Sequence, residues 1–121
     1  MIAGSHRPIA VVIDDDARAA DALELMLRDW GAEVVAALSA EAALERLGAR
    51  ADAAAWVITD FDLGGTNGVD GAKLLLTAAP GARVLVLSGD RGASKAAAAA
   101  GFETLEKPAQ AGAITAWLER A

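Results

Sequence analysis

Four aspartates in this sequence stand where apolar runs end. Asp14, Asp15 and Asp16 follow the run PIAVVI, and Asp60 follows the run AAWVIT much later in the chain. Two carboxylates about 5 Å apart at an effective dielectric of about 20 repel by about 3 kcal/mol, which is a large fraction of a small domain's stability. Proteins keep such clusters where a cation neutralises them or where a raised pKa serves chemistry. The aspartates therefore predict a cation site assembled from two distant stretches of chain.

The residue types at this site favour phosphoryl chemistry on a hard metal ion. An all-oxygen, carboxylate-rich site suits Mg²⁺ or Mn²⁺, and Mg²⁺ is usually held by one or two carboxylates with waters and phosphate oxygens. Two more polar residues stand at the ends of predicted strands: Ser88, a hydrogen-bond donor, and Lys107, a point charge for a phosphoryl ligand. An aspartate beside the metal could itself be the nucleophile and form an aspartyl phosphate.

Apolar runs alternate with helical patterns along the whole chain. The predicted strands are 8–13, 32–38, 54–59, 82–88 and 102–106, and the predicted helices are 17–30, 40–48, 72–79, 92–101 and 109–120. Asp16 and Ser39 are the expected N-caps of the first two helices, and the Gly-rich stretch 60–71 is expected to be a loop. Five strand–helix units with short connections predict an α/β fold, a doubly wound parallel sheet with helices on both faces. Because functional sites of such sheets gather at the carboxyl ends of the strands, the polar residues named above should meet at one edge.

Composition limits the class of protein. The 121 residues are enough for one domain, and the absence of cysteine excludes disulfides and thiolate metal sites and favours a reducing, cytoplasmic setting. The net charge is −6 with scattered basic residues, which argues against direct nucleic-acid binding. No apolar run reaches the roughly 18 residues of a membrane span, so membrane insertion is not expected. Residues 1–6 (MIAGSH) are expected to be a disordered tail or a cloning remnant, and residues 7–121 the domain.

The motifs DDD, DFD, LSG and EKP, each at the end of a predicted strand and in this order, resemble the receiver (response-regulator) domain of bacterial two-component signalling. The resemblance covers roughly residues 7 to 120. It implies a flavodoxin-like five-stranded parallel sheet of order 2-1-3-4-5. More loosely, the chain is similar to receivers attached to hybrid sensor histidine kinases, so it could be a piece of such a kinase.

The resemblance also implies a role for each acidic residue. Asp60 would be the phosphoacceptor and a metal ligand. Asp14 and Asp15 would be the acidic pair that holds Mg²⁺, one of them directly and the other through water. Asp62 would offer its backbone carbonyl to the metal. Asp16 falls outside the acidic pair, which leaves it the capping role.

The remaining implied contacts are to the phosphoryl group. The Ser88 hydroxyl and the Gly89 backbone amide would hydrogen-bond it, and Lys107 would pair with its oxygens. The Lys107–Pro108 bond is a candidate cis peptide. One departure concerns Thr104, which occupies the position of the family's usual aromatic switch residue, so the usual coupling of Ser88 to a rotating ring is in doubt.

The resemblance implies a phosphorylatable switch more than an enzyme, although such a domain catalyses its own phosphorylation and slow dephosphorylation. The phosphoryl donor would be a phosphohistidine on a histidine kinase or a histidine phosphotransfer domain, while the downstream target and oligomeric state stay open. One alternative is a degenerate receiver that only binds proteins. Another is an aspartyl-phosphate phosphatase of the haloacid-dehalogenase type, which ITDFDLGGT resembles superficially. In that family, however, the loop follows the first strand, and this chain has no room for a cap domain.

Overall fold

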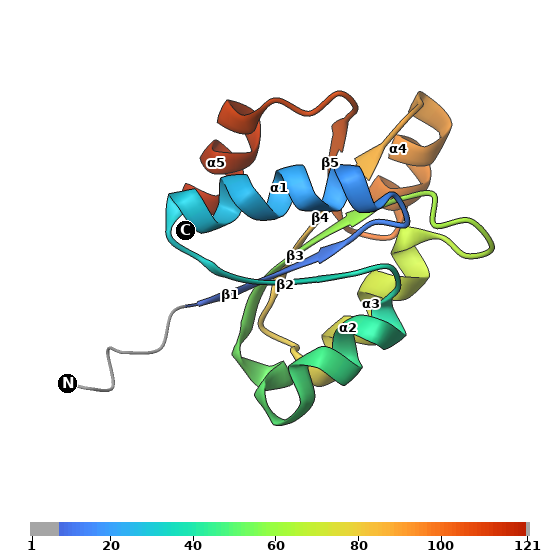
Figure 1. Ribbon diagram of the computed structural model, residues 1–121. Coiled ribbons are helices and arrows are strands. Elements are labelled where there is room, and N and C mark those ends of the chain that lie inside the picture. The colour runs from blue at the N-terminus through green and yellow to red at the C-terminus, as the bar shows by residue number, and fades with distance from the viewer. Residues whose placement is uncertain (1–7, 121) are drawn as a thin grey trace.

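The structure, a computed structural model, describes residues 8–120 (Figure 1). The tail predicted at residues 1–6 lies outside the described residues, as do residues 7 and 121. Five strands alternate with five α-helices, and a short 3₁₀ helix precedes the third strand. The elements in chain order are β1 (Ile9–Ile13), α1 (Ala17–Trp30), β2 (Glu33–Ala37), α2 (Ala40–Leu47), η2 (Gly48–Ala53), β3 (Ala54–Asp60), α3 (Gly68–Ala78), β4 (Arg83–Ser88), α4 (Arg91–Ala99), β5 (Glu103–Glu106) and α5 (Ala111–Glu119).

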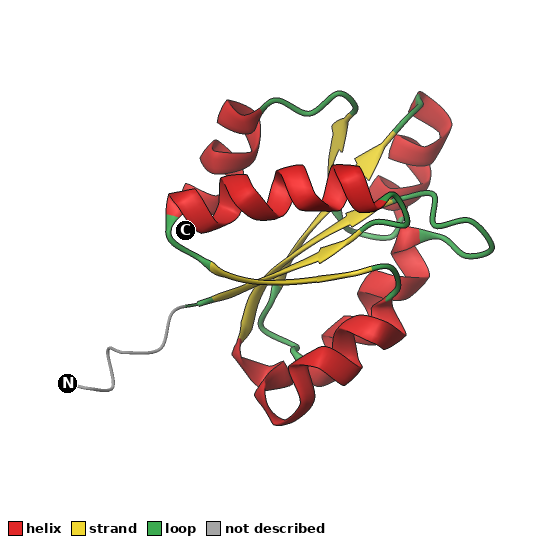
Figure 2. Cartoon of the chain, in the orientation of Figure 1, coloured by secondary structure: helices red, strands yellow, loops and turns green. Residues whose placement is uncertain are grey.

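The strands form one fully parallel sheet in the order β2-β1-β3-β4-β5, which confirms the predicted flavodoxin-like topology (Figure 2). The register is unshifted through most of the sheet; for example, Ile13 pairs with Thr59 and Asp60 pairs with Leu87. Since all strands run in the same direction, their carboxyl ends share one edge of the sheet. No helix among the described residues is long and apolar enough to cross a membrane.

Strands β1 to β4 contribute alternate side chains to two separate layers of core. Ala10 and Val12 of β1 face the layer under α1 and α5, whereas Val11 and Ile13 face the layer under α2, α3 and α4. All of β1 is buried, and in β4 only Arg83 is partly exposed. Central parallel strands read as continuous apolar runs for this reason. Figure 1 shows α1 and α5 on one side of the sheet and α2 and α3 on the other.

Local capping explains where the first two helices begin, and both N-caps are as predicted. The Asp16 carboxylate accepts a hydrogen bond from the backbone N–H of Arg18 at 3.0 Å, and the Ser39 hydroxyl accepts one from Ala42 at 3.1 Å. Such caps satisfy donors that the first helical turn leaves free. Gly31 ends α1 at φ 121°, a backbone conformation that favours glycine.

The main differences from the sequence prediction are the starts of α3 and α5 and one additional element. Helix α3 begins at Gly68 rather than at residue 72, because the Asn67 side chain caps it by accepting the N–H of Asp70 at 2.9 Å. The 3₁₀ helix η2 was not predicted, and α5 begins at Ala111, two residues later than expected. The loop predicted over residues 60–71 was therefore too long, because its Gly-rich composition did not indicate the Asn67 cap or the first turn of α3.

A network around Glu103 of β5 fastens α5 to the sheet. The Glu103 carboxylate accepts hydrogen bonds from Trp117 Nε1 at 2.9 Å, from Arg83 at 3.1 Å and from Arg120 at 3.0 Å. The Arg83 guanidinium also lies over the Trp117 ring, 4.7 Å from its centroid, and donates to the backbone carbonyls of Trp117 and Arg120. These contacts join the start of β4, the start of β5 and the end of α5.

Candidate functional site

Three carboxylates meet at the carboxyl edge of the sheet. Asp14 and Asp15 follow β1, and Asp60 ends the neighbouring strand β3. One oxygen from each of the three lies within 4.8 Å of the others. Asp14 and Asp60 are buried, being 6% and 8% exposed, whereas Asp15 is exposed to solvent. Residues 45 positions apart in the sequence thus form a single acidic cluster, as the strand-end argument predicted.

Lys107 supplies a positive charge to this cluster. Its Nζ lies 2.9 Å from Oδ2 of Asp60, and its backbone N–H donates to the carbonyl of Ser88 at 2.7 Å. Burial by itself would lower the pKa of Lys107, but the hydrogen bond and the charge of Asp60, with the charges of Asp14 and Asp15, raise it above its ordinary value. The lysine is therefore a fixed ammonium at neutral pH. The Lys107–Pro108 peptide is cis, as predicted.

Burial raises the pKa of Asp14, whereas burial by itself lowers the pKa of Lys107, because it disfavours the charged form of either group. Loss of solvent around the carboxyl group raises the pKa of Asp14 above its ordinary value, and the negative charges of Asp60 and Asp15 raise it further. The backbone N–H of Asp16 donates to Asp14 Oδ1 at 2.9 Å and opposes this increase, as does the charge of Lys107. The N–H of Asp16 thus fixes the Asp14 carboxylate in place, while burial and the neighbouring carboxylates disfavour its ionised form.

These residues fit a divalent cation. The donors are all carboxylate oxygens, one is open to water, and the cluster holds more negative charge than a single lysine neutralises. Hard cations such as Mg²⁺ and Ca²⁺ prefer oxygen ligands of this kind. A cation here would lie among Asp14, Asp15 and Asp60.

The Ser88 side chain takes a direction that the sequence did not predict. Ser88 ends β4 and is fully buried, and its hydroxyl forms a hydrogen bond with the hydroxyl of Ser94 in the first turn of α4. Gly89, the next residue, is exposed, with open space around its Cα. Gly89 and Asp62 both line a hollow of about 330 Å³ between the ends of β3 and β4.

The loop after Asp60 folds back against the acidic cluster. The backbone N–H of Asp62 lies 3.4 Å from Asp60 Oδ1, and the Asp62 carboxylate accepts the N–H of Gly64 at 3.2 Å. Gly64 has φ 81°, and a side chain there would begin 3.5 Å from a carboxylate oxygen of Asp15. The loop therefore brings Gly64 beside Asp15, the exposed member of the cluster.

Gly68 is a site residue that sequence reasoning missed. A Cβ at Gly68 would lie 2.1 Å from the backbone oxygen of Asp60, and its N–H donates to the carbonyl of Phe61 at 2.6 Å. Only glycine allows the start of α3 to approach the end of β3 so closely. The signal in the sequence was the Asn-Gly pair, which reads both as a turn and as a helix start.

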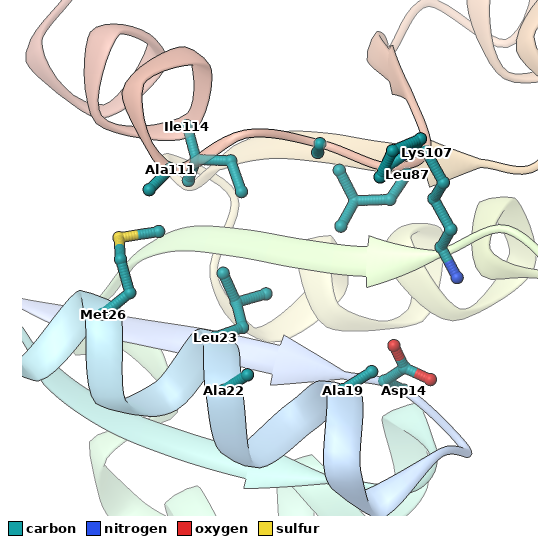
Figure 3. A pocket seen from close by; sticks show the side chains of 11 residues that line it. Asp14, Ala19, Ala22, Leu23, Met26, Leu87, Lys107, Ala111 and Ile114 are labelled. Carbon is teal, nitrogen blue, oxygen red and sulfur yellow. The ribbon is translucent and has the colours of Figure 1, made fainter.

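An apolar groove runs from the site between α1 and α5 (Figure 3). Its volume is about 530 Å³, and Asp14 and Lys107 line one end of it. Figure 3 shows Leu23 and Met26 of α1 facing Ile114 of α5, with the Lys107 side chain extending toward Asp14. Asp14 and Lys107 of the site thus border an apolar groove.

A doubly wound parallel sheet with an acidic cluster and a lysine at its carboxyl edge is the arrangement that the resemblance to receiver domains implied. The sequence model of the family described as "Response regulator receiver domain" matches residues 10–119. The chain belongs to this family. A search of curated proteins gives no match.

Solved structures agree with this assignment. A response regulator protein from Burkholderia pseudomallei, described with a phosphorylated aspartic acid, a calcium ion and citrate, is 31% identical, with a TM-score of 0.78 over 92% of this chain and 66% of that chain. A response regulator from Chloroflexus aurantiacus is 28% identical, with a TM-score of 0.79 over 94% of this chain and 96% of that one. A receiver domain protein from Clostridium thermocellum is 26% identical, with a TM-score of 0.77 over 89% and 88% of the two chains.

Proposed function

We propose that this chain is the phosphoacceptor domain of a two-component phosphorelay. It takes a phosphoryl group from a phosphohistidine onto Asp60 in a Mg²⁺-dependent reaction and changes conformation as a result. The donor is a histidine kinase or a histidine phosphotransfer domain. The observation that carries the proposal is the position of Asp60, which is buried beside Asp14 and Asp15 and paired with Lys107 at 2.9 Å.

Each step of the transfer has a group in this site. A carboxylate oxygen of Asp60 attacks the phosphorus of the phosphohistidine, the new P–O bond forms, and the P–N bond breaks with its electron pair returning to the imidazole. Lys107 is within reach of the phosphoryl oxygens, because its ammonium already contacts the attacking carboxylate. A fixed cation beside an atom where negative charge develops lowers the barrier without reorganisation.

Asp14, Asp15 and Asp60, with the backbone carbonyl of Asp62, would hold the Mg²⁺ ion. When bound, the ion supplies positive charge to the phosphoryl oxygens and screens the carboxylates from one another. The calcium ion described for the Burkholderia pseudomallei response regulator supports a divalent-cation site in this family. The phosphorylated aspartic acid of the same protein supports an aspartate as the acceptor.

A labelling experiment tests the proposal directly. The parent protein, incubated with Mg²⁺ and acetyl phosphate, should gain a single phosphoryl group by intact-mass spectrometry, and Asp60→Asn should gain none. Asp52→Asn is the matched control, since Asp52 is exposed in η2 at the opposite end of β3. Its labelling should equal that of the parent.

The alternatives give different results in the same assay. A degenerate receiver that only binds proteins predicts no labelling of a correctly folded parent. A haloacid-dehalogenase-type phosphatase predicts turnover of small phosphate esters by the parent protein. Either result would refute the proposed function.

A further inference from the structure

The hydroxyl of Ser88 has a partner outside the acidic cluster. It forms a hydrogen bond with the hydroxyl of Ser94, which is half-buried in the first turn of α4. Ser88 itself is fully buried, and no buried side-chain nitrogen or oxygen among the described residues lacks a hydrogen-bond partner. The Ser94 hydroxyl therefore satisfies a polar group that would be costly to leave unpaired.

Strand alternation separates this pair from the acidic cluster. Asp60 is in phase with Ile58, which packs in the layer under α1 and α5. Ser88 is in phase with Val86, which packs in the layer that includes α4. Successive side chains of a strand point to opposite faces, so the Ser88 hydroxyl is turned toward α4 while the Asp60 carboxylate belongs to the other face.

We infer that Ser94 is a positioning residue that holds the Ser88 hydroxyl toward α4 and competes for it with a phosphoryl group on Asp60. This inference rests on the proposed function. In the unphosphorylated protein, the two hydroxyls pair with each other. A phosphoryl group on Asp60 draws the Ser88 hydroxyl toward its oxygens, and the bond to Ser94 breaks.

This exchange of hydrogen-bond partners would transmit phosphorylation of Asp60 to α4 without an aromatic ring. Thr104, in β5, provides no aromatic ring at the position where the resemblance places the switch residue. Helix α4 packs on β4 and β5, and Ser94 lies one turn from its start. Loss of a hydrogen bond at that turn changes the contacts of α4 with the sheet directly.

The test is a comparison of beryllofluoride affinity between the parent and Ser94→Ala. Beryllofluoride with Mg²⁺ imitates the phosphoryl group, and ¹⁹F NMR measures the bound fraction. Without its competitor, the Ser88 hydroxyl is free to turn, so Ser94→Ala should bind about fivefold more tightly, which corresponds to about 1 kcal/mol, the net value of one hydrogen bond. Alanine is the best helix former, and α4 is already rich in it, so this variant should fold.

Three further comparisons separate positioning from a general effect on the helix. Ser94→Thr keeps a hydroxyl and should restore the parent affinity. In a Ser88→Ala background, Ser94→Ala should change nothing, because the contact through which it acts is already gone, and the double-mutant cycle then reports its whole effect as coupling energy. Thr115→Ala removes a hydroxyl that bonds only its own helix α5 and should match the parent.

The outcomes distinguish this inference from the function on which it rests. If the parent binds no beryllofluoride, the proposed function fails. If the parent binds but Ser94→Ala binds equally or more weakly, the proposed function stands and the inference is overturned. The same holds if the effect of Ser94→Ala persists in the Ser88→Ala background.

Discussion

Replacing Asp14 with asparagine should stabilise the metal-free protein. An oxygen of Asp14 and one of Asp60 lie within 4.8 Å, and both residues are buried. At an effective dielectric of about 20, two charges at that separation repel by about 3.5 kcal/mol. Asparagine removes this repulsion and the cost of burying a charge, and it keeps an acceptor for the N–H of Asp16. It also loses the attraction of Asp14 to Lys107.

The net gain should be about 1–2 kcal/mol in the free energy of unfolding at neutral pH, since the lost attraction offsets part of the relieved repulsion. For a chain of this size, that corresponds to an increase in melting temperature of about 4–8 °C. In the parent, Mg²⁺ at ten times its Kd should add about 1.4 kcal/mol, because it binds only the folded form. The variant should lose most of this increase, since it lacks one metal ligand.

The pH dependence of stability provides a second test of Asp14→Asn. Folding raises the pKa of Asp14 above its ordinary value of 3.8, so the folded protein binds this proton more tightly than the unfolded chain does. The protonated form of Asp14 therefore favours the folded state. This contribution to the free energy of unfolding is fully present below pH 3.8 and is lost as the pH rises through the raised pKa of Asp14 in the folded protein. Without metal, the stability difference between Asp14→Asn and the parent should therefore shrink as pH falls through the raised pKa.

Differential scanning calorimetry with and without Mg²⁺, from pH 4 to 8, measures both effects. Asp52→Asn serves as the control, because it removes an exposed aspartate far from the cluster. Such a surface change should alter stability by no more than about 0.5 kcal/mol. A variant at Asp14 that is less stable than the parent without metal, yet keeps the full Mg²⁺ response, would refute the reasoning.

Two more predictions concern the framework of the site. Gly68→Ala should lower the free energy of unfolding by about 2 kcal/mol or more in urea titrations, because its Cβ would lie 2.1 Å from the backbone oxygen of Asp60. Gly112→Ala, with open space in α5, is the control, and equal stability of the two variants would contradict this explanation. Burial raises the pKa of Glu103, but hydrogen bonds from Trp117 and the neighbouring arginines outweigh it, so the pKa is lowered overall. The stabilisation from Glu103 is therefore present above its ordinary value of 4.5 and lost as pH falls through the folded pKa. The melting temperature of Glu103→Gln should be a few degrees below that of the parent at pH 7, and this difference in melting temperature should become smaller at acid pH. A difference that does not change with pH would contradict the role of the Glu103 network.

The parallel sheet and the meeting of the acidic residues could be predicted from the sequence pattern, and the order of the strands from the resemblance to receiver domains. Apolar runs such as RVLVLS are buried on both faces only in a parallel sheet, and such a sheet brings every strand end to one edge. Asp14, Asp60 and Lys107 each follow or end a predicted strand, so topology places them at one edge of the sheet, whereas the contact between Lys107 and Asp60, across the intervening strand β4, is seen only in the structure. The cap at Asp16 follows from local chemistry, since its side chain bonds a backbone group two residues away.

The features that the sequence did not reveal depend on contacts between distant segments. Ser94 is a single serine in a helix of small residues, and nothing local indicates that it faces Ser88. Gly68 looked like one of several loop glycines, because its need for a missing Cβ arises only from the carbonyl of Asp60. The start of α3 was misplaced for a related reason, since Asn67 reads as a turn residue until its cap is seen.

The ion pair between Lys107 and Asp60 fixes the charge that this pocket can accept. Three carboxylates and one ammonium leave two uncompensated negative charges at neutral pH. A monovalent ion would leave the pocket anionic and a trivalent ion would overcompensate it, whereas a divalent ion brings it to electroneutrality. Lys107 would thereby match the formal charge of the pocket to that of a divalent ion without needing to touch the metal.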